Sequence, residues 1–173
     1  MSSIVFEALH SDVMRPCRGT AGSAGYDLAA YLTARTVRVW REGVMRERAS
    51  VDDNGAFSIV LASGEKALVP LGFKARLPQG YEAQIRPRSG TSVRTDLVIA
   101  NAPGTVDADY PDEWCVPVKN GGHAPLVIAH GDRIAQMVLA RFELLEFTEG
   151  TVSASTDRAG GFGSTGAGTH AKS

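Results

Sequence analysis

Short apolar segments separated by glycine and proline most restrict the folds that this chain can adopt. Residues 81–86 alternate apolar and polar side chains, which is typical of a half-buried strand. Residues 134–142 form a longer strand candidate, and shorter candidates lie at 67–70, 97–100 and 126–129. Helical periodicity is scarce, and only residues 91–97 suit a short helix. The pattern predicts an all-β domain of short strands, arranged as a sandwich, jelly roll or barrel.

The local sequence also predicts the surroundings of several polar residues. The Pro-Gly pair within residues 101–104 suits the centre of a type II turn, after which residues 105–106 return as the second arm of a hairpin. Asp27 falls in a turn of small residues. The amide of Gln136 either bonds within the core or faces a ligand, on a strand face shared with two apolar residues, Ile134 and Val138.

The length and the distribution of apolar residues predict one domain followed by an arm. With 173 residues, 43% of them hydrophobic, the chain is long enough to bury a core. We expect this domain at residues 1–147, with a charged insert at about 35–57 that forms an extra hairpin around an Asn54-Gly55 turn. Residues 148–173 carry few large apolar groups and are expected to form a mobile, glycine-rich C-terminal arm.

The charge balance and the cysteines restrict the partners and the compartment. A net charge of −1 argues against binding to a nucleic acid polymer, but it leaves room for a local anion site. No apolar run approaches the roughly 18 residues of a membrane span, so no membrane partner is expected. Cys17 and Cys115 are interpreted as reduced thiols of a cytoplasmic protein, with a single disulfide left open. The four histidines show no metal-ligand spacing.

Three segments carry groups suited to phosphate chemistry. Residues 86–92 (RPRSGTS) place two arginines before the start of a short helix. This segment is either an anion-binding site or a plain strand-to-helix turn with surface arginines. Residues 158–166 (RAGGFGSTG) combine glycine backbone N–H groups, hydroxyls and one aromatic ring. The segment is either a phosphate-binding segment or a disordered glycine-rich tail. Residues 107–113 (DADYPDE) contain four carboxylates. One of them could act as a general base or help to hold a metal, or the segment could be a solvated acidic loop.

Five segments, taken in order, resemble the five motifs of the trimeric dUTPase family. They are AGYDL at 24–28, RPRSG at 86–90, NAPGTVDADY at 101–110, GDRIAQMV at 131–138 and GGFGSTG at 160–166. The resemblance implies a jelly-roll-like β-barrel and Mg²⁺-dependent hydrolysis of dUTP to dUMP and pyrophosphate. It also implies a homotrimer with shared active sites, and a role in keeping uracil out of DNA and supplying dUMP for thymidylate synthesis.

The same resemblance implies a role for each matching residue. Asp107 would be the general base that activates water for attack on the α-phosphorus. Asp27 would hold either Mg²⁺-bound water or Arg88, since the triphosphate itself carries most of the metal contacts. The implied phosphate contacts are Arg88, Ser89, Gly90, Gln136, Arg158 and Ser164. The implied nucleoside contacts are Asn101, Thr105, Val106, Tyr110, Cys115 and a stacked Phe162, with Gly163 beside it.

The chain departs from the family pattern in three places. Arg158 lies one residue closer to Phe162 than usual, so it reaches the phosphate by a different path or less well. Pro111-Asp112 stands where the family usually has a glycine two positions after Tyr110, and the insert has no counterpart in compact members. Two alternatives stay open, a dCTP deaminase of the same fold family and a nucleotide-sensing protein with little turnover. Asp107 and the terminal GFGSTG favour the hydrolase over the deaminase.

Overall fold

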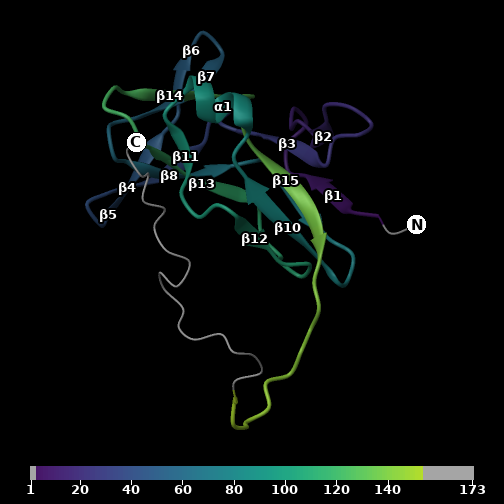
Figure 1. Ribbon diagram of the computed structural model, residues 1–173. Coiled ribbons are helices and arrows are strands. Elements are labelled where there is room, and N and C mark those ends of the chain that lie inside the picture. The colour runs from purple at the N-terminus through teal and green to yellow at the C-terminus, as the bar shows by residue number, and fades with distance from the viewer. Residues whose placement is uncertain (1–2, 154–173) are drawn as a thin grey trace, which may run out of the picture. The chain divides into compact units, whose positions relative to one another are not determined.

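The computed structural model describes residues 3–153 of the chain (Figure 1). Contacts between Cα atoms divide the chain after Glu143, into Met1–Glu143 and a second unit that begins at Leu144. Strands dominate the first unit, and Ser89–Arg94 (α1) is the one helix among the described residues. The predicted all-β fold with one short helix is therefore confirmed. No helix of residues 3–153 is long and apolar enough to cross a membrane.

The strands pair antiparallel throughout the described residues and form four sheets. Two five-stranded sheets have the orders β12-β10-β15-β3-β2 and β11-β13-β8-β4-β5. A three-stranded sheet has the order β14-β7-β6, and β1 pairs with β9. The strand bounds are β1 Val5–Ala8, β2 Cys17–Arg18, β3 Gly25–Ala29, β4 Thr36–Arg41, β5 Val44–Ala49, β6 Val51–Asp53, β7 Ala56–Leu61, β8 Lys66–Pro70, β9 Phe73–Arg76, β10 Tyr81–Arg86, β11 Leu97–Ile99, β12 Gly104–Val106, β13 Cys115–Asn120, β14 Leu126–Ala129 and β15 Arg133–Arg141.

Alternation of buried and exposed side chains places one face of each large sheet in a common core. In β13 the valines at 116 and 118 are fully buried, while Cys115, Pro117 and Lys119, which alternate with them, are half-buried. The same alternation buries Val37 and Val39 of β4. The largest fully buried side chains, which fill the core, are Trp114, Phe73, Leu28, Leu32, Ile59, Leu61, Leu71 and Ile128. Burial of these side chains is the main favourable contribution to folding.

The segment 101–106 differs from the hairpin that the sequence suggests. The peptide bond Ala102-Pro103 is cis, and Gly104 does not adopt the positive φ that a type II turn requires at that position. The strands on either side do not pair with each other: β11 pairs with β13, and β12 pairs with β10. The segment therefore crosses from one five-stranded sheet to the other, because each arm finds its partner in a strand distant in sequence.

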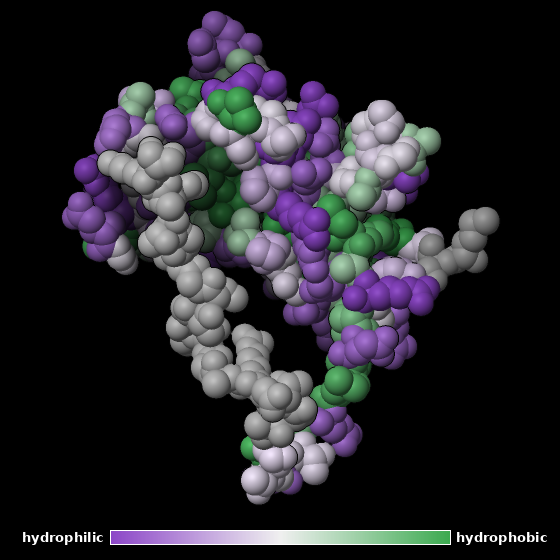
Figure 2. Space-filling view, in the orientation of Figure 1, coloured by the Kyte–Doolittle hydropathy of each residue, from purple (hydrophilic) through white to green (hydrophobic). Residues whose placement is uncertain are grey.

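The charged insert contains two hairpins rather than one. β4 and β5 are joined at Glu42-Gly43, with φ of 51° and 81°, and β6 and β7 at Asn54-Gly55, with φ of 53° and 88°. Positive φ at both turn residues is typical of the two-residue turns that match the twist of paired strands. Each hairpin ends a different sheet, and both hairpin tips are coloured largely as hydrophilic in Figure 2. The insert thus widens two sheets of the domain.

Candidate active site

Asp27 lies in the middle of strand β3, not in the turn suggested by the small residues around it. β3 runs between β2 and β15, and Asp27 is opposite Gln136 in the ladder with β15. The small residues serve close packing instead. A Cβ atom on Gly25 would lie 2.1 Å from Gln136 Oε1, so only glycine leaves room for the Gln136 side chain in its present position.

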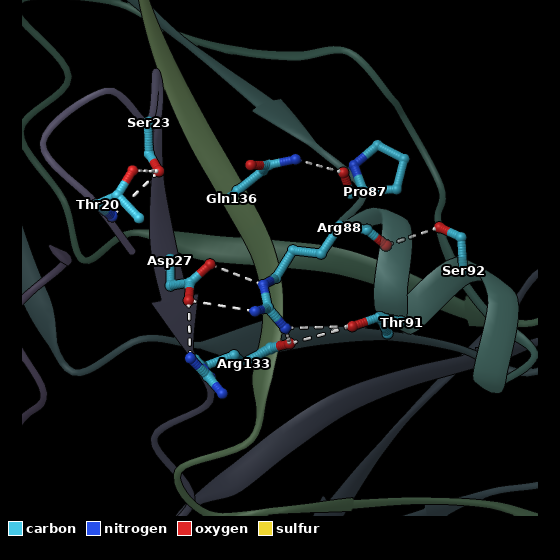
Figure 3. A network of polar contacts seen from close by, with 9 residues as sticks. All are labelled: Thr20, Ser23, Asp27, Pro87, Arg88, Thr91, Ser92, Arg133 and Gln136. Carbon is cyan, nitrogen blue, oxygen red and sulfur yellow. Dashed lines mark hydrogen bonds and ion pairs between the residues drawn. The ribbon is translucent and has the colours of Figure 1, made fainter. Parts of the chain in front are cut away.

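The Asp27 carboxylate binds two arginines from other segments (Figure 3). Arg88 donates from Nε to Oδ1 at 2.7 Å and from Nη2 to Oδ2 at 3.2 Å. Arg133 donates from Nη1 to Oδ2 at 3.1 Å. Because the Arg88 contact is bidentate, it fixes the plane of the guanidinium as well as its position. Arg133 was not among the predicted site residues, although it lies within GDRIAQMV, since nothing local indicates that its side chain turns toward Asp27.

Arg88 also occupies the N-cap position of α1, with extended backbone angles and no capping side-chain hydrogen bond. Ser92 donates to the Arg88 carbonyl from its backbone N at 2.9 Å and from its Oγ at 3.1 Å. Arg88 Nη1 donates to the Arg133 carbonyl at 3.3 Å, and the Ser89 side chain is exposed. The turn between β10 and α1 therefore presents a fixed positive charge beside an open hydroxyl.

Gln136 connects the same turn to β15 and does not share a face with Ile134. The β15–β3 register shifts between Arg133 and Ala135, so Ile134 and Ala135 are both buried and the alternation restarts. Gln136 is half-buried and its Nε2 donates to the Pro87 carbonyl at 2.9 Å. The three motifs with Asp27, Arg88 and Gln136 thus meet in one place in the fold.

The residues implied to contact the nucleoside surround the crossover between the two large sheets. Asn101 and Thr105 are exposed, and Val106 is half-buried against the core. A Cβ atom on Gly104 would lie 2.7 Å from Asn101 Nδ2, so the amide packs directly on this glycine. Cys115 begins β13, opposite Pro70 of β8. Both cysteines are free thiols, and burial raises the pKa of the Cys115 thiol to about 11.

Asp107 and Tyr110 lie in the acidic loop, residues 107–113, which connects β12 to β13. Asp107 is exposed, and Tyr110 is 41% exposed. Partial burial of the Tyr110 ring raises the pKa of its hydroxyl above the ordinary value. Tyr110 borders an open cavity of about 360 Å³ whose other walls include Glu7, Lys74 and Arg76. The loop therefore projects a carboxylate and an aromatic ring toward solvent beside a hollow.

Asp107 and Arg88 lie toward opposite ends of the β10–β12 ladder. Val106 is opposite Ala83 of β10, whereas Arg88 follows the other end of that strand. At about 3.3 Å per residue, this register separates the two segments by roughly 15–20 Å along β10. In Figure 1, α1 lies at the top of the view and β12 lies well below it. A single chain consequently does not bring Asp107 beside Arg88.

The remaining predicted site residues, Arg158, Phe162, Gly163 and Ser164, lie outside the described residues. Within residues 3–153, no cluster of three or more histidine, cysteine, aspartate or glutamate side chains is suited to holding a metal ion. Both oxygens of the Asp27 carboxylate already accept hydrogen bonds from arginine side chains.

Comparisons with known proteins agree with the arrangement of these segments. The dUTPase family model matches residues 45–166. A deoxyuridine 5'-triphosphate nucleotidohydrolase of Caulobacter vibrioides (strain NA1000 / CB15N) is 39% identical over 158 residues, which cover 91% of this chain and 88% of that protein.

Solved phage structures share the fold at lower identity. A mutant dUTPase from phage phi11 of S. aureus has a TM-score of 0.68 at 22% identity, covering 88% of this chain and 99% of that chain. A mutant Staphylococcus bacteriophage 80alpha dUTPase with dUpNHpp has a TM-score of 0.72 at 22% identity, covering 95% of this chain and 99% of that chain. The family model and the curated relative decide for the hydrolase over the deaminase. The chain belongs to the dUTPase family and is an enzyme that hydrolyses dUTP.

Proposed function

We propose that hydrolysis proceeds by attack of an Asp107-activated water on the α-phosphorus of dUTP, giving dUMP and pyrophosphate. Asp107 accepts a proton as the water oxygen bonds to phosphorus, and the bond from phosphorus to the α,β-bridging oxygen breaks. Pyrophosphate leaves with that electron pair. In this way the enzyme keeps uracil out of DNA and supplies dUMP for thymidylate synthesis.

The observation that carries the proposal is the Arg88 guanidinium held by Asp27. Its side chain is 22% exposed, so it meets a phosphate with a fixed orientation and part of its water already removed. Ser89, Gly90 and Gln136 border the same turn and add hydroxyl, backbone and amide donors. The Asp27 geometry favours its role as a holder of Arg88 over a role as a holder of Mg²⁺-bound water.

The segments around the sheet crossover suit recognition of deoxyuridine. Asn101 and the backbone near the exposed Thr105 and the half-buried Val106 would read the uracil edge, with Cys115 closing the pocket. The Cys115 thiol, whose pKa burial raises to about 11, presents an uncharged surface to the base. Tyr110 would pack under the deoxyribose and leave no room for a 2′-hydroxyl. From the C-terminal motif, Phe162 would stack on uracil beside Gly163, and Arg158 and Ser164 would grip the γ-phosphate.

Mg²⁺ would be carried mainly by the triphosphate rather than by a cage of side chains. The described residues fit this mode, since Asp27 has its oxygens engaged by arginines and no other carboxylate joins it. When bound, the metal neutralises phosphate charge and makes the α-phosphorus easier to attack. Magnesium commonly binds proteins through one or two carboxylates and substrate phosphates in this way.

A homotrimer with shared sites would bring the two halves of the site together. Arg88 of one subunit would meet Asp107 of another, which removes the separation of roughly 15–20 Å within one chain. The segment after the compact domain gives further support. Leu144, Leu145 and Phe147 are 84%, 86% and 106% exposed, and contiguous exposed apolar groups of this kind mark interaction sites.

The decisive experiment measures pyrophosphate release from dUTP, UTP, dTTP and dCTP, with and without Mg²⁺. We expect release from dUTP with Mg²⁺ and little release from the other three nucleotides. Asp107→Asn should keep nucleotide binding and lose about 10²–10⁴-fold in kcat, as removal of a general base typically does. Normal turnover by this variant would exclude Asp107 as the base.

A further inference from the structure

Residue Arg35 is fixed at the base of the charged insert by its own backbone. Arg35 N lies 3.2 Å from the Leu32 carbonyl and 3.1 Å from Ser50 Oγ. Ser50 N donates to the Arg35 carbonyl at 2.8 Å, which closes the β4–β5 hairpin at its open end. The direction in which the Arg35 side chain leaves the backbone is therefore set by the insert.

The Arg35 side chain leaves the insert and contacts the last residue of the acidic loop. Its Nη2 donates to Glu113 Oε2 at 2.5 Å, and the two side chains are 25% and 19% exposed. Glu113 Oε1 accepts from Gly72 N at 2.9 Å, so both carboxylate oxygens are used. Arg35 Nη1 lies 3.1 Å from His10 Nε2, and its guanidinium lies over the Tyr31 ring, 5.9 Å from the centroid. These contacts hold Glu113 between the insert and the Gly72 turn.

The position of the Gly72 turn is itself tightly determined. Gly72 has a φ of +76°, which favours glycine, and a Cβ atom there would lie 2.7 Å from Tyr31 Cγ and 2.8 Å from Val13 Cγ2. The backbone N–H group of Gly72, which donates its hydrogen bond to Glu113, therefore cannot shift easily. Glu113 is consequently held by one rigid donor from the core and one charged donor from the insert.

The rest of the acidic loop has few contacts of its own within residues 3–153. Its internal hydrogen bond joins Tyr110 N to the Asp107 carbonyl at 3.3 Å, and Ala108 packs against the core. Its four carboxylates include three exposed ones, at Asp107, Asp109 and Asp112, and the open cavity lies beside Tyr110. Among the described residues, the polar side-chain contacts between this loop and other segments are those of Glu113.

We propose that Arg35 is a positioning residue that acts through Glu113 on the acidic loop, so that the insert supports Asp107 and Tyr110. In this role Arg35 acts on the loop and not on the substrate. The inference rests on the proposed function, because it needs Asp107 and Tyr110 of that loop to act on dUTP. Misplacement of a reacting group by about 1 Å can lower a rate by up to 10²-fold, so loss of this contact should appear in kcat.

The test compares Arg35→Gln, Glu113→Gln and the double variant in the full-length enzyme. Glu113→Gln keeps an acceptor for Gly72 N, removes the charge and replaces the oxygen that accepts from Arg35 with an amide NH2 group. We expect each single variant to lose about 10-fold in kcat/KM, mainly through kcat, with no further loss in the double variant because the two residues act as a pair. Arg35→Lys should recover part of the loss, since a lysine retains the charge.

The ion pair between Arg48 and Glu65 supplies a matched control. Arg48 also lies in the insert, its Nη1 is 2.8 Å from Glu65 Oε2, and the pair has no contact with the acidic loop. Arg48→Gln should lower the thermal midpoint and leave kcat/KM unchanged. If Arg35→Gln behaves in the same way, or if the two single effects add, the positioning role is wrong.

Parallel measurement of Asp107→Asn separates this inference from the proposed mechanism. An active Asp107→Asn enzyme would overturn the mechanism. An inactive Asp107→Asn enzyme together with a fully active Arg35→Gln enzyme would overturn only the role of Arg35.

Discussion

At the scale of single residues, the packing of Gln136 on Gly25 is the most sensitive contact around Asp27. A methyl group at position 25 would lie 2.1 Å from Gln136 Oε1, so Gly25→Ala must displace the amide from the Pro87 carbonyl. In the proposed site Gln136 contacts the phosphates, so we expect this substitution to lower kcat/KM by about 10-fold, since displacement of one hydrogen-bonding group costs about 1–2 kcal/mol. Steady-state kinetics with dUTP measures the effect.

The loop before β3 offers a control with the same chemical change. A Cβ atom on Gly22 would meet nothing within 4 Å, so Gly22→Ala should leave kcat/KM at the wild-type value. Equal losses in Gly22→Ala and Gly25→Ala would show that a general loss of flexibility, and not the Gln136 contact, is responsible. Wild-type activity in Gly25→Ala would show that the position of Gln136 does not matter.

At the scale of secondary-structure elements, the two insert hairpins depend on their turn glycines. Gly43 and Gly55 have φ of +81° and +88°, and a Cβ atom on either would meet nothing within 4 Å. Gly43→Ala and Gly55→Ala should therefore lower the free energy of unfolding by about 1–2 kcal/mol each through backbone strain alone. Urea unfolding checks this, with Gly19→Ala as the control because its nearest neighbour would be Ser23 Oγ at 3.8 Å.

We expect kcat/KM to be independent of the loss of stability in the two turn variants, Gly43→Ala and Gly55→Ala. Each turn lies at the far end of its hairpin from Arg35 and Ser50, so kcat/KM should stay unchanged in both turn variants. A fall in kcat/KM that matches the loss of stability would mean that the insert acts on the site as a whole, rather than through its base.

Elements that depend on local sequence were predicted well, and elements that depend on distant partners were not. The alternating segment 81–86 and the segment 126–129 match the bounds of β10 and β14. The hairpin predicted at 101–106 is wrong, because pairing with β10 and β13 outweighs the local turn preference of Pro-Gly. The contacts of Arg133 and Arg35 were missed for the same reason, since their partners Asp27 and Glu113 are far away in sequence.

At the scale of the whole molecule, the separation of Arg88 from Asp107 along one ladder has a consequence for the proposed homotrimer when two variants are mixed. In the proposed homotrimer, the Arg88→Gln and Asp107→Asn variants should each be nearly inactive on their own. Each lacks one of the two halves in every site. If Arg88 and Asp107 in a site come from different subunits, mixed trimers contain some sites with both halves intact.

Co-expression of the two variants with different affinity tags tests this arrangement. In a closed trimer with head-to-tail contacts, every mixed trimer has one site in three with wild-type Arg88 and wild-type Asp107, so doubly tagged material should recover about a third of wild-type kcat. A site built within one chain would recover nothing, because every chain then carries one defect. Circular dichroism and light scattering on each variant alone establish that both fold and assemble. Recovery of kcat in a co-expressed sample that contains no doubly tagged oligomers would contradict sharing of the site between subunits.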